Sequence, residues 1–442
     1  MKLEERELFL DLHLHSRYSR AVSSQMVPGE MALWAAKKGI DVLGSGDFTH
    51  PLWLRQLESE LEESGEGVYC RRGGEKKEKT VNFLLSGELS CIYSQGGRLR
   101  RIHLLVLVPN FTTAYKVNRE LERRGFNLAS DGRPILGIAV KDLAVILKEV
   151  DENISLIPAH IWTPWYSLYG SFSGFGSLEE CFGQASPVVK AVETGLSSDP
   201  AMNWQIEDLA GRQIVSFSDA HSPTKLGREM TVVSLPKGEL SFRKIVDALE
   251  GEGKINFTVE FYPEEGKYHF SGHRICKICR SPEEISQLGR TCPVCGRPLT
   301  LGVAQRVEEL KRKGSSFGGE KPEEIFDDFG VCWQKVSSRP PYVSLVPLLE
   351  ILAQIRNVGL SSKKVINDYN NLTVLLGAER EIMLRRKPEE IERAGGVKLK
   401  EAVLRVRGGK ILIKPGFDGQ FGEVKIWGGE EERRKEAQIS LF

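Results

Sequence analysis

Short apolar runs alternate with amphipathic stretches along the first 260 residues of the chain. The apolar runs cover residues 8–12, 42–46, 82–86, 102–108, 156–158, 188–192, 214–217 and 230–234. Amphipathic stretches at 29–38, 112–124, 141–150 and 242–251 lie between them. Such alternation predicts repeated strand–helix–strand units, and hence an α/β fold built on a parallel barrel.

The composition and spacing of residues change after residue 262. Cysteine pairs and short turns fill residues 263–302, and helical patterning returns at 345–393 before a β-like run at 410–414. A chain of 442 residues is also too long for one ordinary core. We therefore expect a barrel at 1–262, a small metal-stapled module at 263–302, a mostly helical C-terminal region at 303–429 that binds DNA, and a flexible tail at 430–442.

Bulk charge does not identify the class of partner, because 61 Lys and Arg balance 60 Asp and Glu. The first residues lack the apolar segment of a signal peptide, and no later run of about 18 apolar residues is long enough to span a bilayer. We expect a cytoplasmic protein with no membrane partner. Eight cysteines are too few for a disulfide scaffold, which favours metal binding by those that are paired.

Polar residues gather at the ends of the apolar runs. His13 and His15, two positions apart in an extended segment, project to the same side and can share one metal ion. The other candidates at run ends are Asp47, His50, Glu88, His103, His160, Asp219 and His221. A lone histidine in such a run is more often a buried structural residue. Together, however, these residues predict a metal centre at the carboxyl ends of the barrel strands.

Clustered divalent metals suit phosphoester hydrolysis, because they activate water and neutralise the charge that develops on phosphate. Imidazole and carboxylate ligands fit Zn, Mn or Fe, and Mg remains open. The sequence contains no nucleophile elbow and no P-loop that would indicate another chemistry.

Cys276, Cys279, Cys292 and Cys295 form two C-x-x-C pairs. Two such pairs predict one tetrahedral structural zinc in a small ribbon. His269 and His273 lie close by, and we interpret them as loop residues.

Three further features bear on partners. Trp162, Trp165 and Tyr166 follow His160 and are candidates for stacking on DNA bases, although a loop packed by its own aromatics is the alternative. Arg71 and Arg72 are candidates for phosphate contacts, with an ordinary solvated face as the alternative. The final residues Gln438, Ile439, Leu441 and Phe442 resemble peptides that bind the bacterial sliding clamp; the alternative is a plain disordered end.

The motifs D-L-H-L-H-S (11–16), G-D-F-T-H (46–50), G-E-L-S (87–90), P-A-H (158–160) and S-D-A-H (218–221), in this order, resemble the polymerase-and-histidinol-phosphatase (PHP) family. The resemblance implies a (β/α)7 barrel with two or three divalent metals. It assigns His13, His15 and Asp219 to one metal, Glu88 as a bridge to a second on His103 and His160, and His50, His221 and Asp47 to a third. Asp219, Glu88 and His160 would be the catalytic residues. Ala21 occupies a position where many relatives have histidine, which weakens the third site.

The order of barrel, ribbon and helical tail is similar to that of the endonuclease Q family, as are the segments at 159–165, 193–200 and 414–419. This resemblance implies cleavage of double-stranded DNA on the 5′ side of deaminated bases (uracil, hypoxanthine, xanthine) or abasic sites. Two alternatives stay open: a small-molecule phosphomonoesterase of the histidinol-phosphatase type, and a non-catalytic DNA or clamp adaptor.

Overall fold

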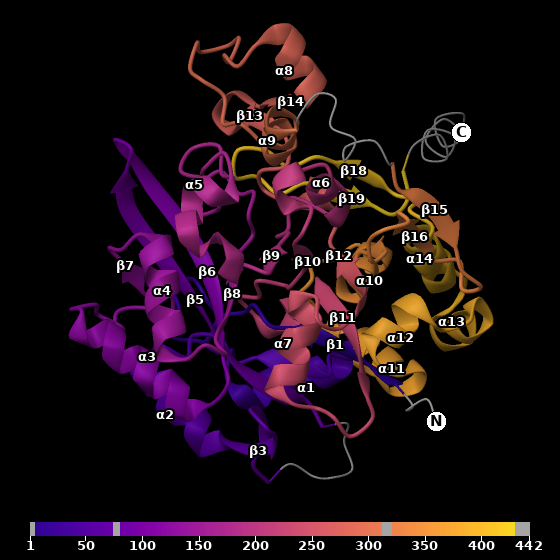
Figure 1. Ribbon diagram of the computed structural model, residues 1–442. Coiled ribbons are helices and arrows are strands. Elements are labelled where there is room, and N and C mark those ends of the chain that lie inside the picture. The colour runs from indigo at the N-terminus through magenta and orange to yellow at the C-terminus, as the bar shows by residue number, and fades with distance from the viewer. Residues whose placement is uncertain (1–4, 74–79, 312–320, 429–442) are drawn as a thin grey trace.

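The computed structural model describes residues 5–73, 80–311 and 321–428 (Figure 1). The strands of the first 260 residues are β1 (Glu5–Asp11), β2 (Val42–Gly44), β3 (Leu61–Gly65), β4 (Val68–Arg71), β5 (Asn82–Gln95), β6 (Arg98–Val108), β7 (Ile135–Leu136), β8 (Ser155–Pro158), β9 (Ala191–Glu193), β10 (Gln213–Val215), β11 (Met230–Pro236) and β12 (Ile255–Glu260). The strand–helix alternation expected from the apolar runs is present.

Most of these strands belong to one mixed sheet of 13 strands. β1, β2 and β5 pair in parallel, whereas β11 pairs antiparallel with both β1 and β12. β6 pairs antiparallel with β5 and β8, and β9 and β10 form a separate parallel pair. The hydrogen-bond ladders of the described strands do not close into a ring, so the architecture is α/β with a large mixed sheet and the sevenfold barrel is not confirmed.

Alternate residues of these strands nevertheless share one apolar core. It contains Leu10 of β1, Val42 of β2, Leu105 of β6, Ile157 of β8 and Val215 of β10, all buried. A larger apolar cluster fills the opposite face of the strands, between them and the surrounding helices. Burial on both faces explains why the strands read as continuous apolar runs rather than as alternating ones.

The surrounding helices begin and end where their sequences dictate. The structure contains α1 (Pro28–Lys38), α2 (Pro51–Glu60), α3 (Phe111–Arg123), α4 (Val140–Val150), α5 (Leu178–Phe182), α6 (Pro200–Trp204) and α7 (Phe242–Glu250). In α7 the side chain of Ser241 caps the first turn, and Gly251 ends the helix with a φ of 95°. Because only glycine adopts this conformation freely, the helix stops there.

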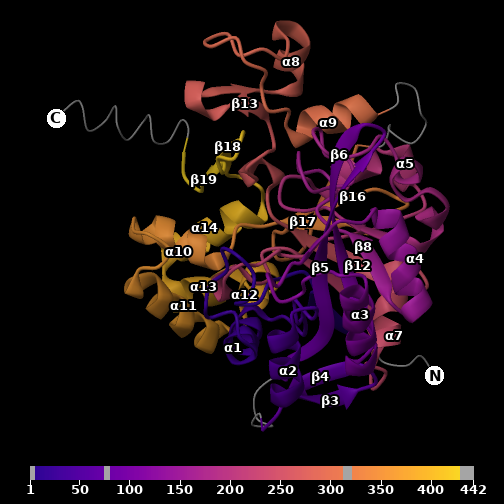
Figure 2. The same ribbon diagram turned by 90° about the vertical axis from the view of Figure 1, so that its left-hand side faces the viewer.

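The cysteine-rich module projects from the body of the protein at the top of both ribbon views (Figures 1 and 2). It consists of β13 (Ser271–His273), which pairs antiparallel with β14 (Ile278–Arg280), followed by α8 (Pro282–Leu288). Helix α9 (Val303–Leu310) returns the chain to the body.

The C-terminal region is mostly helical, with α10 (Leu348–Arg356), α11 (Lys363–Leu376), α12 (Glu379–Leu384), α13 (Pro388–Gly395), α14 (Val397–Arg407) and a hairpin of β18 (Leu412–Lys414) and β19 (Glu423–Lys425). It also contributes β15 (Glu323–Phe326), β16 (Cys332–Lys335) and β17 (Tyr342–Ser344), which extend the central sheet through a parallel pairing of β17 with β12. One sheet therefore runs across the boundary expected at residue 262. None of the helices within the described residues is long and apolar enough to cross a membrane.

Candidate metal centre

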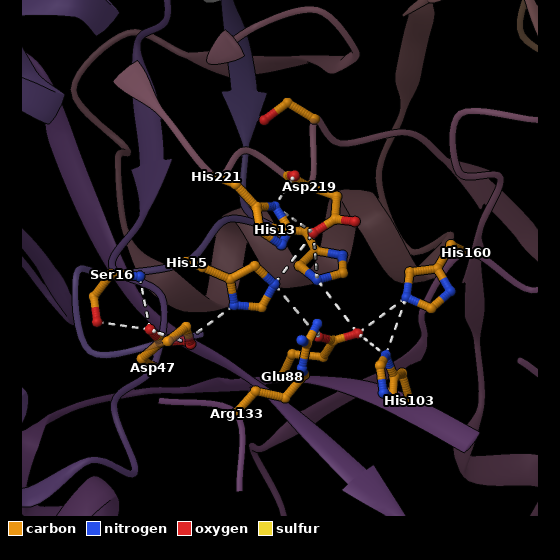
Figure 3. Close-up of polar contacts among 12 residues, drawn as sticks. His13, His15, Ser16, Asp47, Glu88, His103, Arg133, His160, Asp219 and His221 are labelled. Carbon is orange, nitrogen blue, oxygen red and sulfur yellow. Dashed lines mark hydrogen bonds and ion pairs between the residues drawn. The ribbon is translucent and has the colours of Figure 1, made fainter. Parts of the chain in front are cut away.

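The side chains expected at the strand ends meet at one place in the structure (Figure 3). They come from the segment after β1, from β5 and β6, and from the turns after β8 and β10. The residues brought together are His13, His15, Glu88, His103, His160, Asp219 and His221. Three overlapping groups form among them, in each of which the ligand atoms lie within 4.8 Å of one another.

The first group surrounds the Nε2 atom of His13. This atom lies 3.7 Å from a Glu88 oxygen and 3.8 Å from Asp219, and Nε2 of His15 lies 3.4 Å and 3.1 Å from the same two carboxylates. Four donors around one zinc ion at about 2.0 Å are themselves about 3.3 Å apart, so this spacing fits a metal ion. His13 Nε2 is buried and has no hydrogen-bond partner, which a metal would supply.

The second group uses the other face of Glu88. Its Oε1 lies 2.5 Å from His103 Nδ1 and 3.0 Å from His160 Nε2, while its Oε2 faces His15. Oε1 also lies 3.7 Å from His13 Nε2, so Glu88 contributes to both groups and would be the residue shared by two metals that the PHP resemblance implies.

The third group differs from the expected one. It contains His15, Asp219 and His221. The Nδ1 atom of His221 lies 3.6 Å from Asp219 Oδ1. Asp47 and His50 belong to no such group, although both are described and buried. We propose His15, Asp219 and His221 as a third ligand set, and the assignment of His50 and Asp47 to a metal stays a prediction.

Asp47 lies behind His15 and contacts the loop that follows it. One of its oxygens accepts hydrogen bonds from the backbone and hydroxyl of Ser16 and from the hydroxyl of Ser19, and the other lies 3.1 Å from His15 Nδ1. A carboxylate behind a ligand histidine fixes the orientation and tautomer of the ring. His50 accepts a hydrogen bond from the backbone of Trp53 at the start of α2 and stacks on Tyr18.

Glu193 supports His13 in the same manner and was missed in the sequence. Both of its oxygens lie 2.9 Å from His13 Nδ1, and the backbone N–H of His160 donates to Oε2 at 2.7 Å. Glu193 ends β9, in a segment whose Gly195 packs so closely on His160 that an added Cβ would lie 2.4 Å from the histidine Cβ. The one signal in the sequence was a carboxylate at the end of an apolar run.

Arg133 is the second residue that the sequence did not reveal. Its Nη1 donates to Glu88 Oε2 at 3.0 Å. The short loop that carries it contains no motif, and only the fold brings it to the metal centre.

Three residues of the centre have left-handed backbone conformations. The φ angles are 48° for Asp47, 31° for His160 and 46° for Asp219. Such angles cost roughly 1 to 3 kcal/mol each for residues other than glycine and persist where the surroundings enforce them, typically at functional sites.

The carboxylates and imidazoles of the centre shift one another's pKa values. Burial alone would raise the pKa of Glu88, but adjacent cationic groups outweigh it and hold that pKa well below its usual range. Burial lowers the pKa of His103 to about 4, whereas the neighbouring carboxylates raise the pKa of His13 well above its usual range and that of His15 to about 9. Because a metal binds neutral imidazole, a bound metal would displace the protons that these carboxylates hold on His13 and His15.

The cysteine-rich module forms a fourth candidate site. The cluster contains Cys276, Cys292, Cys295 and His273, and His273 Nδ1 lies 3.4 Å from Cys295 Sγ. Cys279 is outside this group and His273 is inside it. Three thiolates and one imidazole are a common structural zinc set, so the site stays compatible with a zinc ribbon.

The residues expected to contact DNA have different environments. Trp162 is 1% exposed and donates to Asn203, which makes it a core residue and removes it from the stacking candidates. Trp165 stacks on Phe172 with centroids 4.8 Å apart, and Tyr166 packs against His103 at 4.7 Å. The loop is thus partly packed by its own aromatics, and both residues keep exposed surface.

Arg71 and Arg72 lie away from the metal centre. Arg71 ends β4, whose partner residues Asn82 and Phe83 begin β5, and Glu88 lies further along that strand. Arg71 is level with a position seven residues before Glu88 along the strand, which corresponds to roughly 23 Å. The peptide Gln438, Ile439, Leu441 and Phe442 lies outside the described residues.

A cavity of about 460 Å³ opens beside the metal ligands. His160, Asp219 and His221 line one side of it, and Tyr268 and Phe421, which follow the residue 262 boundary, line the other. The cavity therefore lies between the metal centre and the C-terminal part of the chain.

The chain is similar in sequence to two uncharacterized proteins. No family model matches it. It is 27% identical to the uncharacterized protein YqxK of Bacillus subtilis over 95% of this chain and 100% of YqxK. It is also 30% identical to the uncharacterized protein MJ0043 of Methanocaldococcus jannaschii over 63% of this chain, and spans about a third (33%) of that longer protein.

Two solved structures match over nearly the whole chain. The lesion-specific endonuclease PfuEndoQ of Pyrococcus furiosus is 28% identical, with a TM-score of 0.78 over 97% of this chain and 99% of that one. An endonuclease Q bound to a 27-mer duplex with an abasic lesion at its active site is 30% identical, with a TM-score of 0.80 over 96% and 98%. The chain belongs to the endonuclease Q family. The endonuclease Q resemblance seen in the motifs is thereby confirmed.

Proposed function

We propose that this protein is a metal-dependent DNA repair endonuclease that hydrolyses the phosphodiester on the 5′ side of an abasic site or of a deaminated base such as uracil, hypoxanthine or xanthine. The observation that carries the proposal is the cavity beside the metal ligands, in a chain that matches endonuclease Q over nearly its whole length. The neighbour's abasic duplex supports DNA as the substrate.

The residues of the first two groups fit two divalent metals, and those of the third fit one more. When bound, the metals would supply the activation of water and the neutralisation of charge on the phosphate. The chain itself holds the ligand rings in place: Glu193 fixes His13, and Asp47 fixes His15.

The cavity supports recognition by base flipping. An enzyme that inspects a base in a duplex must extrude it from the stack, and a damaged pair resists this less. Tyr268 and Phe421 offer aromatic surface for an extruded base, and Lys267 lies over the Phe421 ring at 4.5 Å. Because His160 and Asp219 line the same cavity, a nucleotide held there would present its flanking phosphodiester to the metals.

Two substitutions test the two halves of the proposal. Asp219→Asn removes the carboxylate ligand of the third group, which also lies 3.8 Å from His13 Nε2, and should lower nicking by at least about 1,000-fold while leaving the fold intact. Asp368→Asn, on the surface of α11, is the matched control. Tyr268→Ala should instead reduce the preference for damaged over intact duplex. Wild-type nicking by Asp219→Asn would refute the metal assignment, and unchanged preference in Tyr268→Ala would refute the role of the cavity.

A further inference from the structure

Arg133 lies inside the metal centre, yet metal binding does not explain it. It sits in the loop between α3 and β7, and Figure 3 shows its guanidinium beside Glu88, to which Nη1 donates at 3.0 Å. A guanidinium stays protonated and offers no lone pair to a metal. A permanent cation beside bound divalent metals repels them, so its presence favours an anion as a further occupant of the centre.

The loop holds this cation rigidly. The backbone of Gly132 donates to Tyr18 at 3.0 Å, and an added Cβ at Gly132 would lie 2.2 Å from an Asp47 oxygen. The backbone of Arg133 donates to Asp131 at 3.0 Å. The loop is thus packed directly on Asp47, which itself supports His15, and the direction of the Arg133 side chain is coupled to the metal ligands.

The Arg133 guanidinium also has N–H donors that Glu88 does not use. Its side chain is 25% exposed, close to the 27% of Asp219 at the mouth of the centre, and within the described part of the chain Glu88 is its one hydrogen-bond partner. The fork geometry of arginine suits two oxygens of a phosphate, and one arm can remain on Glu88 while the other reaches a ligand.

We propose that Arg133 binds a non-bridging oxygen of the scissile phosphate and stabilises the negative charge that grows there during hydrolysis. This inference rests on the proposed function for the identity of the phosphodiester. Removal of a comparable donor to developing charge lowers kcat by roughly 100- to 1,000-fold, and we expect that loss for Arg133→Gln, with partial recovery in Arg133→Lys.

The experiment compares wild type, Arg133→Gln, Arg133→Lys and the control Arg20→Gln, all as the metal-loaded full chain. Arg20 is an exposed neighbour that pairs with Asp131 of the same loop, so its substitution removes the same charge without facing Glu88. Metal content per chain is measured first. Binding of inorganic phosphate follows by calorimetry, and then nicking of a lesion duplex whose scissile linkage is either a phosphodiester or an uncharged methylphosphonate.

We expect full metal content in each variant, at least 10-fold weaker phosphate binding by Arg133→Gln alone, and at least a 10-fold smaller rate ratio between the two linkages in that variant. Loss of metal by Arg133→Gln, or phosphate binding equal to wild type, would overturn the inference. If wild type nicks no duplex at all, the proposed function fails, while phosphate binding still decides the role of Arg133.

Discussion

Glu193→Gln offers a test of how the metal centre is organised, because it changes one charge and almost no volume. Glu193 presents two acceptor oxygens to two buried donors, the Nδ1–H of His13 and the backbone N–H of His160. An amide has one acceptor oxygen, so one of these donors would face the NH₂ group of glutamine. A buried donor without its acceptor costs roughly 1 to 3 kcal/mol.

The lost hydrogen bond destabilises the orientation of the His13 ring that binds metal. Loss of a carboxylate that is hydrogen-bonded to a ligand histidine weakens metal affinity by about 10- to 100-fold. This loss corresponds to roughly 1.4 to 2.7 kcal/mol of binding free energy, within the range of the hydrogen-bond cost. We expect Glu193→Gln to need 10- to 100-fold more free metal for half-maximal nicking and to regain most of its activity at saturating metal.

Metal titration of nicking, with metal content measured after dialysis, checks this prediction. Glu149→Gln on the exposed face of α4 is the matched control and should behave as wild type. If Glu193→Gln binds metal as tightly as the control, the hydrogen bond to His13 does not organise the centre and the argument fails.

Three further predictions follow from other parts of the molecule. Burial raises the pKa of Glu260 to about 8 from its ordinary 4.5, so between these pH values the folded protein holds a proton that the unfolded chain releases, and the free energy of unfolding should fall as pH rises. Relative to wild type, Glu260→Gln should therefore gain about 1 to 3 kcal/mol of unfolding free energy at pH 8 and nothing at pH 4.5. Urea unfolding at both pH values measures this difference. His273→Ala should lose zinc on mild chelation and lower the Tm more than Cys279→Ser; the reverse order would restore the four-cysteine site. Deletion of residues 438–442 should abolish recovery of the protein with an immobilised bacterial sliding clamp, and equal recovery would remove that partner.

Much of the metal centre was predictable because its ligands occupy strand ends. The i and i+2 spacing of His13 and His15, and the polar positions at Glu88, His103 and His160, follow from strand geometry alone. Helices such as α1 and α4 were also predictable to within a residue at each end, because local capping and periodicity determine them.

What the sequence did not reveal depends on long-range contacts. Glu193 and His13 are 180 positions apart, and Arg133 and Glu88 are 45 apart, so no local pattern marks either pair. The partners of Asp47 were also not visible in the sequence: the hydroxyls of Ser16 and Ser19, in the loop after His15, donate to its carboxylate. The extension of the sheet by β15–β17 was missed for the same reason, since these strands are three or four residues long and their partners lie elsewhere in the chain.

We propose that this metal centre cuts DNA beside a damaged base. The direct measurement is to incubate end-labelled duplexes that carry one abasic site, uracil, hypoxanthine or no lesion with the protein, with added Mg²⁺, Mn²⁺ or Zn²⁺ or with chelator, and to map each product to the nucleotide. We predict one nick on the 5′ side of the lesion, dependent on metal and absent from the intact duplex. Equal cutting of the intact duplex, or no nick together with release of phosphate from small monoesters, would contradict the account.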